Sequence, residues 1–528
     1  MIGAVLAAHL TYGLVSGPYR GTYEEWDTAS GLHREITDIP GVYHEDAAYD
    51  GAHAWTVDLS GVPHSLSGAA RARLVTKAYQ GSLLFSHPAA ITVTPPGGVA
   101  LTIELDATGH AVREERRPAC GAAEVEKLSD WTEASGIVAP HRVERAEDVL
   151  TLQSASMERL DLKPPRVRTP MTRTAVVIPF ETQAFHIFVP LRVNRGERQW
   201  FVLDTGADLS FVTHGLSAAK SIETSGSGGS VEAGMAADVN LQLGGVTVPL
   251  KVIGITPESG FSALWGRSFD GVAGYDVISR FVMRIDWTHR RLTLFDPEHF
   301  RYRGGGAVVP LRFQGNNIVI PVTVTLPDGT QKEIESVIDT GSSGALSFRS
   351  GFSPDVGKTI AAQGYGVGGR TETSIGRISA LAIGPYILRE PIVELSHAKG
   401  GTESGCAVPS SIGERILSRF TVYLDYAHER LILEPNAHLG DRFDYDMSGL
   451  DLRVSDGRVK IVSVRDGSAG ANAGLKPGDV IAAAGGRKIA AAALPTLQER
   501  FRRASDLAMT IDRGGETLRL VVHLRREV

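Results

Sequence analysis

Two Asp-Thr-Gly tripeptides are the residues of this chain best suited to chemistry. They occupy residues 204–206 and 339–341, and each follows an apolar run that is typical of a β-strand. Two carboxylates held about 3 Å apart cannot both ionise, so they share one proton and can act together as general base and general acid. The sequence therefore predicts a two-carboxylate site, provided that the fold brings Asp204 and Asp339 together.

The surroundings of the two tripeptides also repeat, which separates them from ordinary turns. A single Asp-Thr-Gly would be weak evidence, because Asp and Gly are common turn residues. Here a Gly-x-Gly-Gly run and a later Gly-containing element recur as well. The two aspartates are 135 residues apart, and Gly274 and Gly413 are 139 residues apart. The chain therefore carries two copies of one unit, which we assign to residues 172–302 and 303–437.

The order of these elements resembles the aspartic proteases, the retroviral type in particular, in a two-lobed bacterial form with both halves in one chain. The resemblance implies a mainly β fold with tandem acid-protease β-barrel lobes, in which water activated between Asp204 and Asp339 hydrolyses a peptide bond. The implied supporting residues around the two acids are Thr205, Gly206, Thr340, Gly341, Gly274 and Gly413. The implied substrate-binding residues, in the flaps and groove, are Asp208, Gly226, Gly228, Gly229, Gly366, Gly368 and Gly369.

The two copies differ from the family pattern and from each other. The elements expected to brace the acids carry Val272-Ala273 and Ser411-Ile412, where the family has bulkier apolar residues. Ala207 follows the first tripeptide and Ser342 the second. Since a hydroxyl can donate to a carboxylate and a methyl group cannot, we expect inequivalent acids and highest activity at mildly acidic pH. Tyr365, beside the second flap, suits a core or a surface position equally.

Composition and motif counts bound the other function classes. The chain is 42% hydrophobic and 22% charged with a net charge of −6, which gives no basic footprint for nucleic acid. No apolar run approaches the roughly 20 residues of a membrane span. No histidine spacing predicts a metal site, and no cofactor is expected. Cys120 and Cys406 lie in different expected domains, so we expect two isolated buried thiols, although a disulfide stays open.

Residues 1–165 are expected to form a β-rich domain. Short alternating segments are interrupted by one expected helix at about residues 69–80, and Lys163-Pro-Pro-Arg166 reads as a linker. The pattern loosely resembles the sheets of bacterial lipoprotein carriers, which leaves two roles open: a cradle for substrate or lipid, and a scaffold that packs on the lobes. The first residues lack the charged start of a signal peptide. Export to a periplasmic or extracytoplasmic site is expected if an upstream signal was lost.

The last part of the chain, residues 445–528, carries a different signature. The run Gly474-Leu-Lys-Pro-Gly478-Asp479, after an apolar strand and a helix of small residues, resembles the bacterial PDZ domain. The resemblance implies a loop that caps the carboxylate of a peptide C-terminus, and the residues in that position are Gly449, Leu450, Asp451 and Leu452. A helix at residues 494–504 would form one wall of the groove.

Two functions from different classes remain after this comparison. One is an aspartic endopeptidase whose protein substrates are recognised with the help of the PDZ domain. The alternative is a catalytically inactive peptide-binding or scaffold protein. The retention of an Asp in both copies favours the peptidase, because a binding protein gains nothing from two carboxylates that repel each other.

Overall fold

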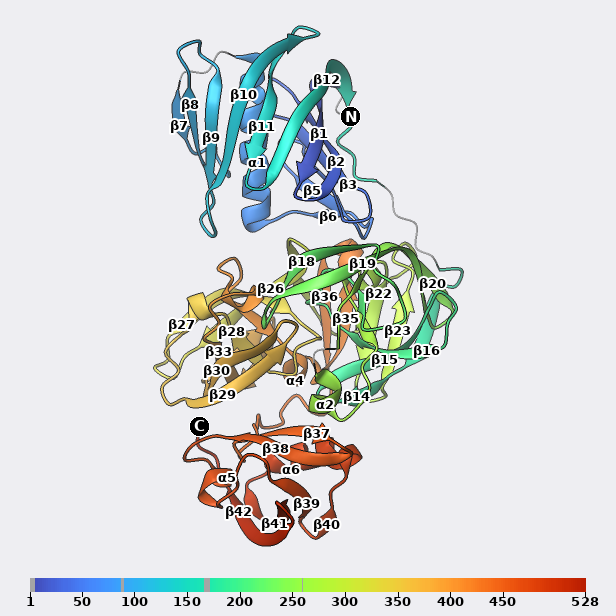
Figure 1. Cartoon of the computed structure of the whole chain (residues 1–528), viewed down its shortest axis with the longest axis vertical. Coiled ribbons are helices and arrows are strands. Elements are labelled where there is room, and N and C mark those ends of the chain that lie inside the picture. The colour runs from blue at the N-terminus through green and yellow to red at the C-terminus, as the bar shows by residue number, and fades with distance from the viewer. Residues whose placement is uncertain (1–4, 87–89, 166–170, 259) are drawn as a thin grey trace.

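Strands dominate this protein, and the computed structural model arranges them in five sheets along one long axis. It describes residues 5–86, 90–165, 171–258 and 260–528. An N-terminal sheet lies at one end, two β-rich lobes lie in the middle, and a small C-terminal domain lies at the other end (Figure 1). The fold is therefore mainly β, as expected from the sequence. The end of the expected linker, Arg166, lies outside the described residues.

The N-terminal sheet has twelve antiparallel strands and one helix, α1 (Gly68–Ser82). The first and last strands pair at its centre, so two meanders of six strands extend from a shared middle. The strands are β1 (Val5–Ser16), β2 (Tyr19–Asp27), β3 (His33–Ile39), β4 (Tyr43–Tyr49), β5 (Ala54–Asp58), β6 (His64–Ser65), β7 (Ile91–Val93), β8 (Ala100–Leu105), β9 (Ala111–Arg117), β10 (Glu124–Ala134), β11 (Ile137–Arg145) and β12 (Asp148–Leu160).

Buried charges lie among the apolar core residues of this domain, beside α1. Lys77 of α1 is 4% exposed and lies 3.4 Å from the carboxylate of Glu126, which also pairs with Arg116 at 2.8 Å. His33 and Asp27 form a second buried pair at 2.7 Å. Burying a charge is costly unless it is paired, and the charges here are paired. A lipid cradle, by contrast, needs an apolar lining. Apolar side chains and paired charges together form this interior, and the scaffold and cradle roles both stay predictions.

A six-stranded sheet joins the two lobes. Its central pair, β22 and β35, brings one strand from each repeat into antiparallel contact, with Ile285 opposite Val422. The equivalent outer strands then follow on each side, so the two lobes share a common base. Its strands, in spatial order, are β13 (Ala175–Pro179), β23 (Arg291–Phe295), β22 (Val282–Asp286), β35 (Phe420–Asp425), β36 (Arg430–Pro435) and β24 (Ala307–Pro310).

Each lobe has its own larger sheet, and the two sheets repeat one pairing pattern. In lobe 1, β21 is parallel to β16 and antiparallel to β17, which is parallel to β20. The strands of this lobe are β14 (Glu181–Gln183), β15 (His186–Val193), β16 (Arg198–Leu203), β17 (Phe211–Val212), β18 (Lys220–Gly226), β19 (Gly229–Leu243), β20 (Val246–Ile255) and β21 (Gly271–Ala273), with helices α2 (Phe261–Trp265) and α3 (Tyr275–Ile278).

In lobe 2 the same relations link β27, β34, β28 and β33. This agreement is what the sequence repeat predicts. The strands of lobe 2 are β25 (Arg312–Gln314), β26 (Asn317–Thr325), β27 (Gln331–Ile338), β28 (Leu346–Phe348), β29 (Ile360–Gly366), β30 (Gly369–Arg377), β31 (Ala380–Ile383), β32 (Tyr386–Arg389), β33 (Ile392–Ser396) and β34 (Ser410–Ile412), with helix α4 (Glu414–Leu417).

The C-terminal domain is a six-stranded sheet with two helices. Leu494, Leu497 and Phe501 of α6 are buried against the sheet, as the sequence predicts, although the helix ends at Phe501 and not at Ala504. Its elements are β37 (Leu450–Ser455), β38 (Arg458–Val464), α5 (Ala469–Asn472), β39 (Val480–Ala484), β40 (Arg487–Lys488), α6 (Leu494–Phe501), β41 (Ser505–Arg513) and β42 (Glu516–Leu524). Across the described residues, no helix is both long and apolar enough to cross a membrane.

Candidate active site

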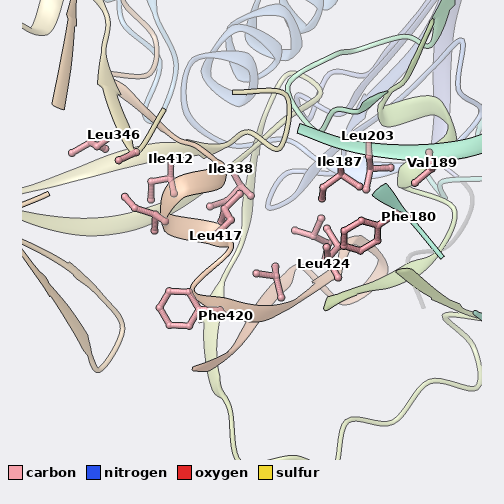
Figure 2. Packing of buried hydrophobic residues seen from close by; sticks show 14 of the residues in the cluster. Phe180, Ile187, Val189, Leu203, Ile338, Leu346, Ile412, Leu417, Phe420 and Leu424 are labelled. Atoms are coloured by element: carbon pink, nitrogen blue, oxygen red, sulfur yellow. The ribbon is translucent and has the colours of Figure 1, made fainter. Parts of the chain in front are cut away.

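Asp204 and Asp339 lie at equivalent places, each directly after a core strand. Asp204 follows β16 and its amide donates to the carbonyl of Ala273 at 3.0 Å; Asp339 follows β27 and donates to Ile412 at 3.0 Å. The preceding residues Leu203 and Ile338 are fully buried and belong to the hydrophobic core cluster that Figure 2 shows. Burial of each such side chain contributes about 1.5–3 kcal/mol, so the ends of both strands are held firmly.

Thr205 and Thr340 join the two lobes by four reciprocal hydrogen bonds. The Thr205 hydroxyl donates to the carbonyl of Ile338 at 2.6 Å, and the Thr340 hydroxyl donates to that of Leu203 at 2.8 Å. Each hydroxyl also accepts from the amide of the other threonine, at 3.1 Å and 3.0 Å. The pseudo-twofold axis that relates the two lobes passes between these two threonines.

Replacing Thr340 with Val is expected to destabilise the protein by about 1–3 kcal/mol for each group left unpaired, because a buried amide and a buried carbonyl then lose their partners. Denaturant unfolding measures this loss. Thr340→Ser keeps the hydroxyl and is the matched control. Equal stability of the Val and Ser variants would show that the cross-lobe bonds do not hold the lobes together.

The two carboxyl groups meet across this axis. The Gly206 amide donates to Asp204 at 2.8 Å, and the Gly341 amide donates to Asp339 at 2.9 Å. Each glycine also lies against the opposite acid: a side chain on Gly341 would overlap the Asp204 carboxyl, and one on Gly206 would lie 2.9 Å from an Asp339 oxygen. Both glycines are therefore required by the close approach of the acids.

The pKa of both acids is raised. Burial is the main cause for each, and for Asp339 the negative charges of Asp204 and Glu403 raise the pKa further, to well above its usual range. For Asp204 the rise is opposed by the Gly206 amide first, and then by a hydrogen bond between the two carboxyl groups that favours its charged form. This is the pattern of a pair that holds one proton between two oxygens.

The source of this inequivalence differs from the one expected from the sequence. The Ser342 hydroxyl accepts a hydrogen bond from the Gly344 amide at 3.3 Å, and among the described residues no hydrogen bond from it to Asp339 is found. The Ala207 amide, by contrast, helps to lower the pKa of Asp204, while Glu403 raises that of Asp339. The Ala207 amide and Glu403 thus contribute to the difference between the acids, and a comparison of the side chains at positions 207 and 342 does not reveal them.

The bracing elements hold the acid loops despite their small residues. A side chain on Gly274 would lie 2.7 Å from the Ala207 carbonyl, and one on Gly413 would lie 2.6 Å from that of Gly344. The next amides, of Tyr275 and Glu414, donate to the two acid loops at 2.8 and 2.9 Å. Glycine at these positions therefore lets the braces approach closely enough for hydrogen bonding.

The two glycine-rich hairpins meet tip to tip above the acids. The β18–β19 hairpin presents Gly228, whose amide donates to the Val367 carbonyl of the β29–β30 hairpin at 2.8 Å. A side chain at Gly226, Gly228, Gly366 or Gly368 would overlap the opposite tip. Tyr365 lies outside this contact: its hydroxyl donates to Asp451 of the C-terminal domain, and Arg453 stacks on its ring at 4.1 Å.

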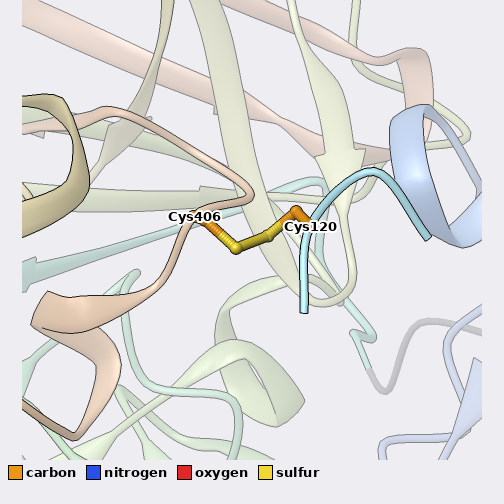
Figure 3. The surroundings of a disulfide bond; sticks show 2 residues. All are labelled: Cys120 and Cys406. Atoms are coloured by element: carbon orange, nitrogen blue, oxygen red, sulfur yellow. A yellow bond between two sulfur atoms is a disulfide. The ribbon is translucent and has the colours of Figure 1, made fainter. Parts of the chain in front are cut away.

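Cys120 and Cys406 form a disulfide, which corrects the expectation of two isolated thiols (Figure 3). The expectation was wrong because the two domains are in contact, so residues 286 positions apart have Cα atoms 5.6 Å apart. The bond ties the loop between β9 and β10 to the segment 397–409 of lobe 2. That segment contacts the first flap, since a side chain on Gly401 would overlap the Gly226 carbonyl, and it carries Glu403 toward Asp339.

The acids open into a cleft of about 2520 Å³. Side chains of all the domains line it, including Asp58 of the N-terminal sheet and Glu499 of α6. Asp208 also lines it; desolvation by the surrounding cleft, and then the charges of Asp58 and Asp204, raise its pKa to about 6. In the described part of the chain, no group of three or more His, Cys, Asp or Glu side chains could hold a metal ion.

Several residues that line the cleft were not predicted from the sequence. His186 packs on Trp265 with ring centroids 4.5 Å apart, and burial lowers its pKa to about 4, so it is neutral. Glu403 and Glu394 also line the cleft. None of the three belongs to a repeated motif, and their positions on loops or strands become meaningful only when the lobes are assembled.

The expected carboxylate loop lies at the edge of the C-terminal sheet. Gly449 has a φ of 69°, and a side chain there would overlap Ser468. Leu450 and Asp451 begin β37, which is an edge strand, so its free side can accept an additional strand. Leu452 is buried in the core of the domain. The far end of β37 packs against α2 of lobe 1, and all four expected loop residues line the common cleft.

Residues 448–524 match the PDZ domain family. PDZ domains bind peptides, so this match shows a protein-interaction role for the C-terminal domain. No curated protein matches the chain. Among solved structures, the crystal structure of aspartic proteinase from Irpex lacteus matches 51% of this chain and 99% of that chain, with 14% sequence identity and a TM-score of 0.36.

Proposed function

We propose that this chain is an aspartic endopeptidase of the two-lobed, retropepsin-like type. The observation that carries the proposal is the pair of carboxyls, Asp204 and Asp339, which approach each other where Thr205 and Thr340 lock two equivalent strands. A shared proton between two such groups lets one act as base while the other acts as acid.

The pair can hydrolyse a peptide bond without a covalent intermediate. The ionised carboxylate accepts a proton from a water molecule, whose oxygen attacks the peptide carbonyl carbon. The protonated carboxyl donates its proton to the carbonyl oxygen, which gives a neutral tetrahedral diol. The carboxyl that took the proton from water then donates it to the amide nitrogen, while the other carboxylate takes a proton from a hydroxyl of the diol. The C–N bond breaks, the amine and the carboxylic acid leave, and the pair again holds one proton. The flap tips, joined through Gly228 and Val367, would exclude bulk water from this sequence.

The alternative is a binding scaffold without turnover. It keeps the cleft and the PDZ domain but gives no reason for two carboxyls whose burial and mutual repulsion raise the pKa of Asp339. Unpaired buried charge is costly and is retained mainly at functional sites. The peptidase proposal gives a reason for the free-energy cost of holding two carboxyls together, and the scaffold does not.

We extend the proposal to the flanking parts. The PDZ domain would bind the C-terminus of a protein substrate along β37, whose loop residues 449–452 open into the same cleft as the acids. The disulfide supports maturation in an oxidising compartment, such as the bacterial periplasm or another extracytoplasmic space.

The pH dependence of cleavage is expected to be bell-shaped with its maximum at mildly acidic pH. The active form holds one proton, and the raised pKa of Asp339 keeps that proton bound above the pH at which an ordinary aspartate loses it. Activity should fall about tenfold per pH unit once the pH exceeds this upper pKa, and again when both acids are protonated at low pH. A rate of peptide cleavage that stays flat from pH 4 to 8 would contradict the shared proton.

The direct test is to incubate the protein with an unfolded protein substrate in the presence of hydroxylamine and to analyse the products by mass spectrometry. Direct attack by water predicts internal cleavage with free carboxylates at every new C-terminus. Hydroxamates at those ends would reveal an acyl-enzyme and exclude the proposed mechanism. Binding of the substrate without any cleavage would favour the scaffold.

A further inference from the structure

Equivalent positions of the two lobes differ in chemistry on either side of the acids. Strand register defines the pairs: Phe211 lies opposite Val272 and beside Gly254 in lobe 1, whereas Ser347 lies opposite Ser411 and beside Glu394 in lobe 2. All six residues line the cleft. The axis between Thr205 and Thr340 relates the three residues of lobe 1 to the three of lobe 2. A peptide that lies across the acids therefore places one side chain against the lobe 1 residues and another against the lobe 2 residues.

The wall of lobe 1 is aromatic. Phe211 contacts Phe269 with ring centroids 6.1 Å apart, and Phe269 contacts Phe261 at 5.5 Å and Trp265 at 5.4 Å. These rings form one cluster with Val272 and face the cleft. Among the charged groups of lobe 1 that line the cleft, Asp204 and Asp208 belong to the acid loop. A large apolar or aromatic side chain fits this wall, because it would remove further apolar surface from water.

The wall of lobe 2 is polar and contains a carboxylate, Glu394, that accepts no hydrogen bond from the described groups. The Glu394 side chain lies beside the acid loop: a side chain on Gly344 would be 3.0 Å from its oxygen. Nearby charged groups of lobe 2 are Arg415, which attracts Glu394, and the pair Arg349 and Glu403. Glu414 also lines the cleft, and burial raises its pKa well above the usual range, which favours its uncharged form. The two arginines offset the two glutamates, and the acid pair adds one negative charge.

We infer that this cleft selects substrates with an aromatic or large apolar residue on the lobe 1 side of the cleaved bond and a lysine or arginine on the lobe 2 side, where Glu394 receives the cation. The inference rests on the proposed peptidase function. A buried carboxylate that lacks a donor gains a strong charge-assisted hydrogen bond from a cationic side chain, and the small residues Ser347 and Ser411 leave room for it. The bulky Phe211 fills the equivalent space in lobe 1.

The test compares two peptides that differ only in the residue on the lobe 2 side of the cleaved bond, lysine in one and norleucine in the other. The wild type should cleave the lysine peptide with the higher kcat/KM. In Glu394→Gln that advantage should fall by about 10- to 100-fold, the range of a hydrogen bond to a charged group, while the norleucine peptide is unaffected. Glu333→Gln, an exposed glutamate of the same lobe, is the matched control.

Binding of both peptides to the Asp339→Asn variant separates this inference from the proposed function. A lysine preference in binding that disappears with Glu394→Gln supports the inference even if the wild type cleaves neither peptide, in which case the peptidase proposal fails alone. Cleavage that depends on Asp339 but shows no lysine preference, or a preference unchanged by Glu394→Gln, overturns the inference and leaves the peptidase intact.

Discussion

Replacing either Asp204 or Asp339 with Asn is expected to lower the rate of peptide cleavage by on the order of 10²–10⁴-fold, the usual contribution of general acid–base catalysis. Asn has nearly the same shape as Asp but cannot ionise at neutral pH or share a proton. One acid alone cannot both activate water and protonate the carbonyl oxygen. The measurement is kcat for an unfolded protein substrate, with each single variant assayed separately.

Stability distinguishes this loss from unfolding. The folded pKa of both acids is raised, so their contribution to stability is fully present below the unfolded pKa and is lost as the pH rises through the folded pKa. Above the folded pKa, the ionised acids destabilise the folded state because they lie in a poorly hydrated site. Asn carries no charge and avoids this cost, so we expect the free energy of unfolding at pH 7 to be unchanged or higher in the variants. Asp238→Asn, an exposed site of lobe 1 with φ of 54°, is the control for the substitution itself. Full activity in either catalytic variant would refute the shared-proton mechanism.

Loss of the disulfide is expected to have the largest effect on stability. Cys120 and Cys406 are 286 residues apart, and chain-entropy arguments give roughly 5 kcal/mol for closing a loop of that length. The Cys120→Ser, Cys406→Ser double variant should therefore unfold at a clearly lower denaturant concentration. Reductant should lower the midpoint of the wild type toward that of the double variant and leave the double variant unchanged. A wild type insensitive to reductant would contradict the structural role of the bond.

The same variant has an expected catalytic signature. The disulfide anchors the segment that carries Glu403, and Glu403 helps to raise the pKa of Asp339. Once the segment is released, the upper pKa of the pH–rate profile should move to lower pH. A purely structural disulfide would lower stability without moving that profile, so the two measurements together define its role.

The repeated tripeptides and the spacing around them were sufficient to predict which residues meet at the centre. Asp, Thr and Gly at strand ends are local signals, and the second copy supplied the partner for the first. The close approach of Gly206 and Gly341 to the opposite acids gives a physical reason for those residue types. Residues 272–273 and 411–412 are smaller than their counterparts in the family, yet they still hold the acid loops. The amides of Asp204 and Asp339 donate to the carbonyls of Ala273 and Ile412, and these hydrogen bonds need no bulky side chain.

The sequence by itself determined what depends on local pattern: mainly β structure, an internal repeat with two equivalent acids, glycine-rich hairpins and a C-terminal PDZ domain. Only the tertiary structure decided the pairing of Cys120 with Cys406, the approach of Glu403 to Asp339, and the contrast between Phe211 and Glu394 in the two walls. Turn and strand preferences act between neighbours in the chain. These other contacts join residues far apart in sequence, and they exist only because separately folded domains pack at one cleft.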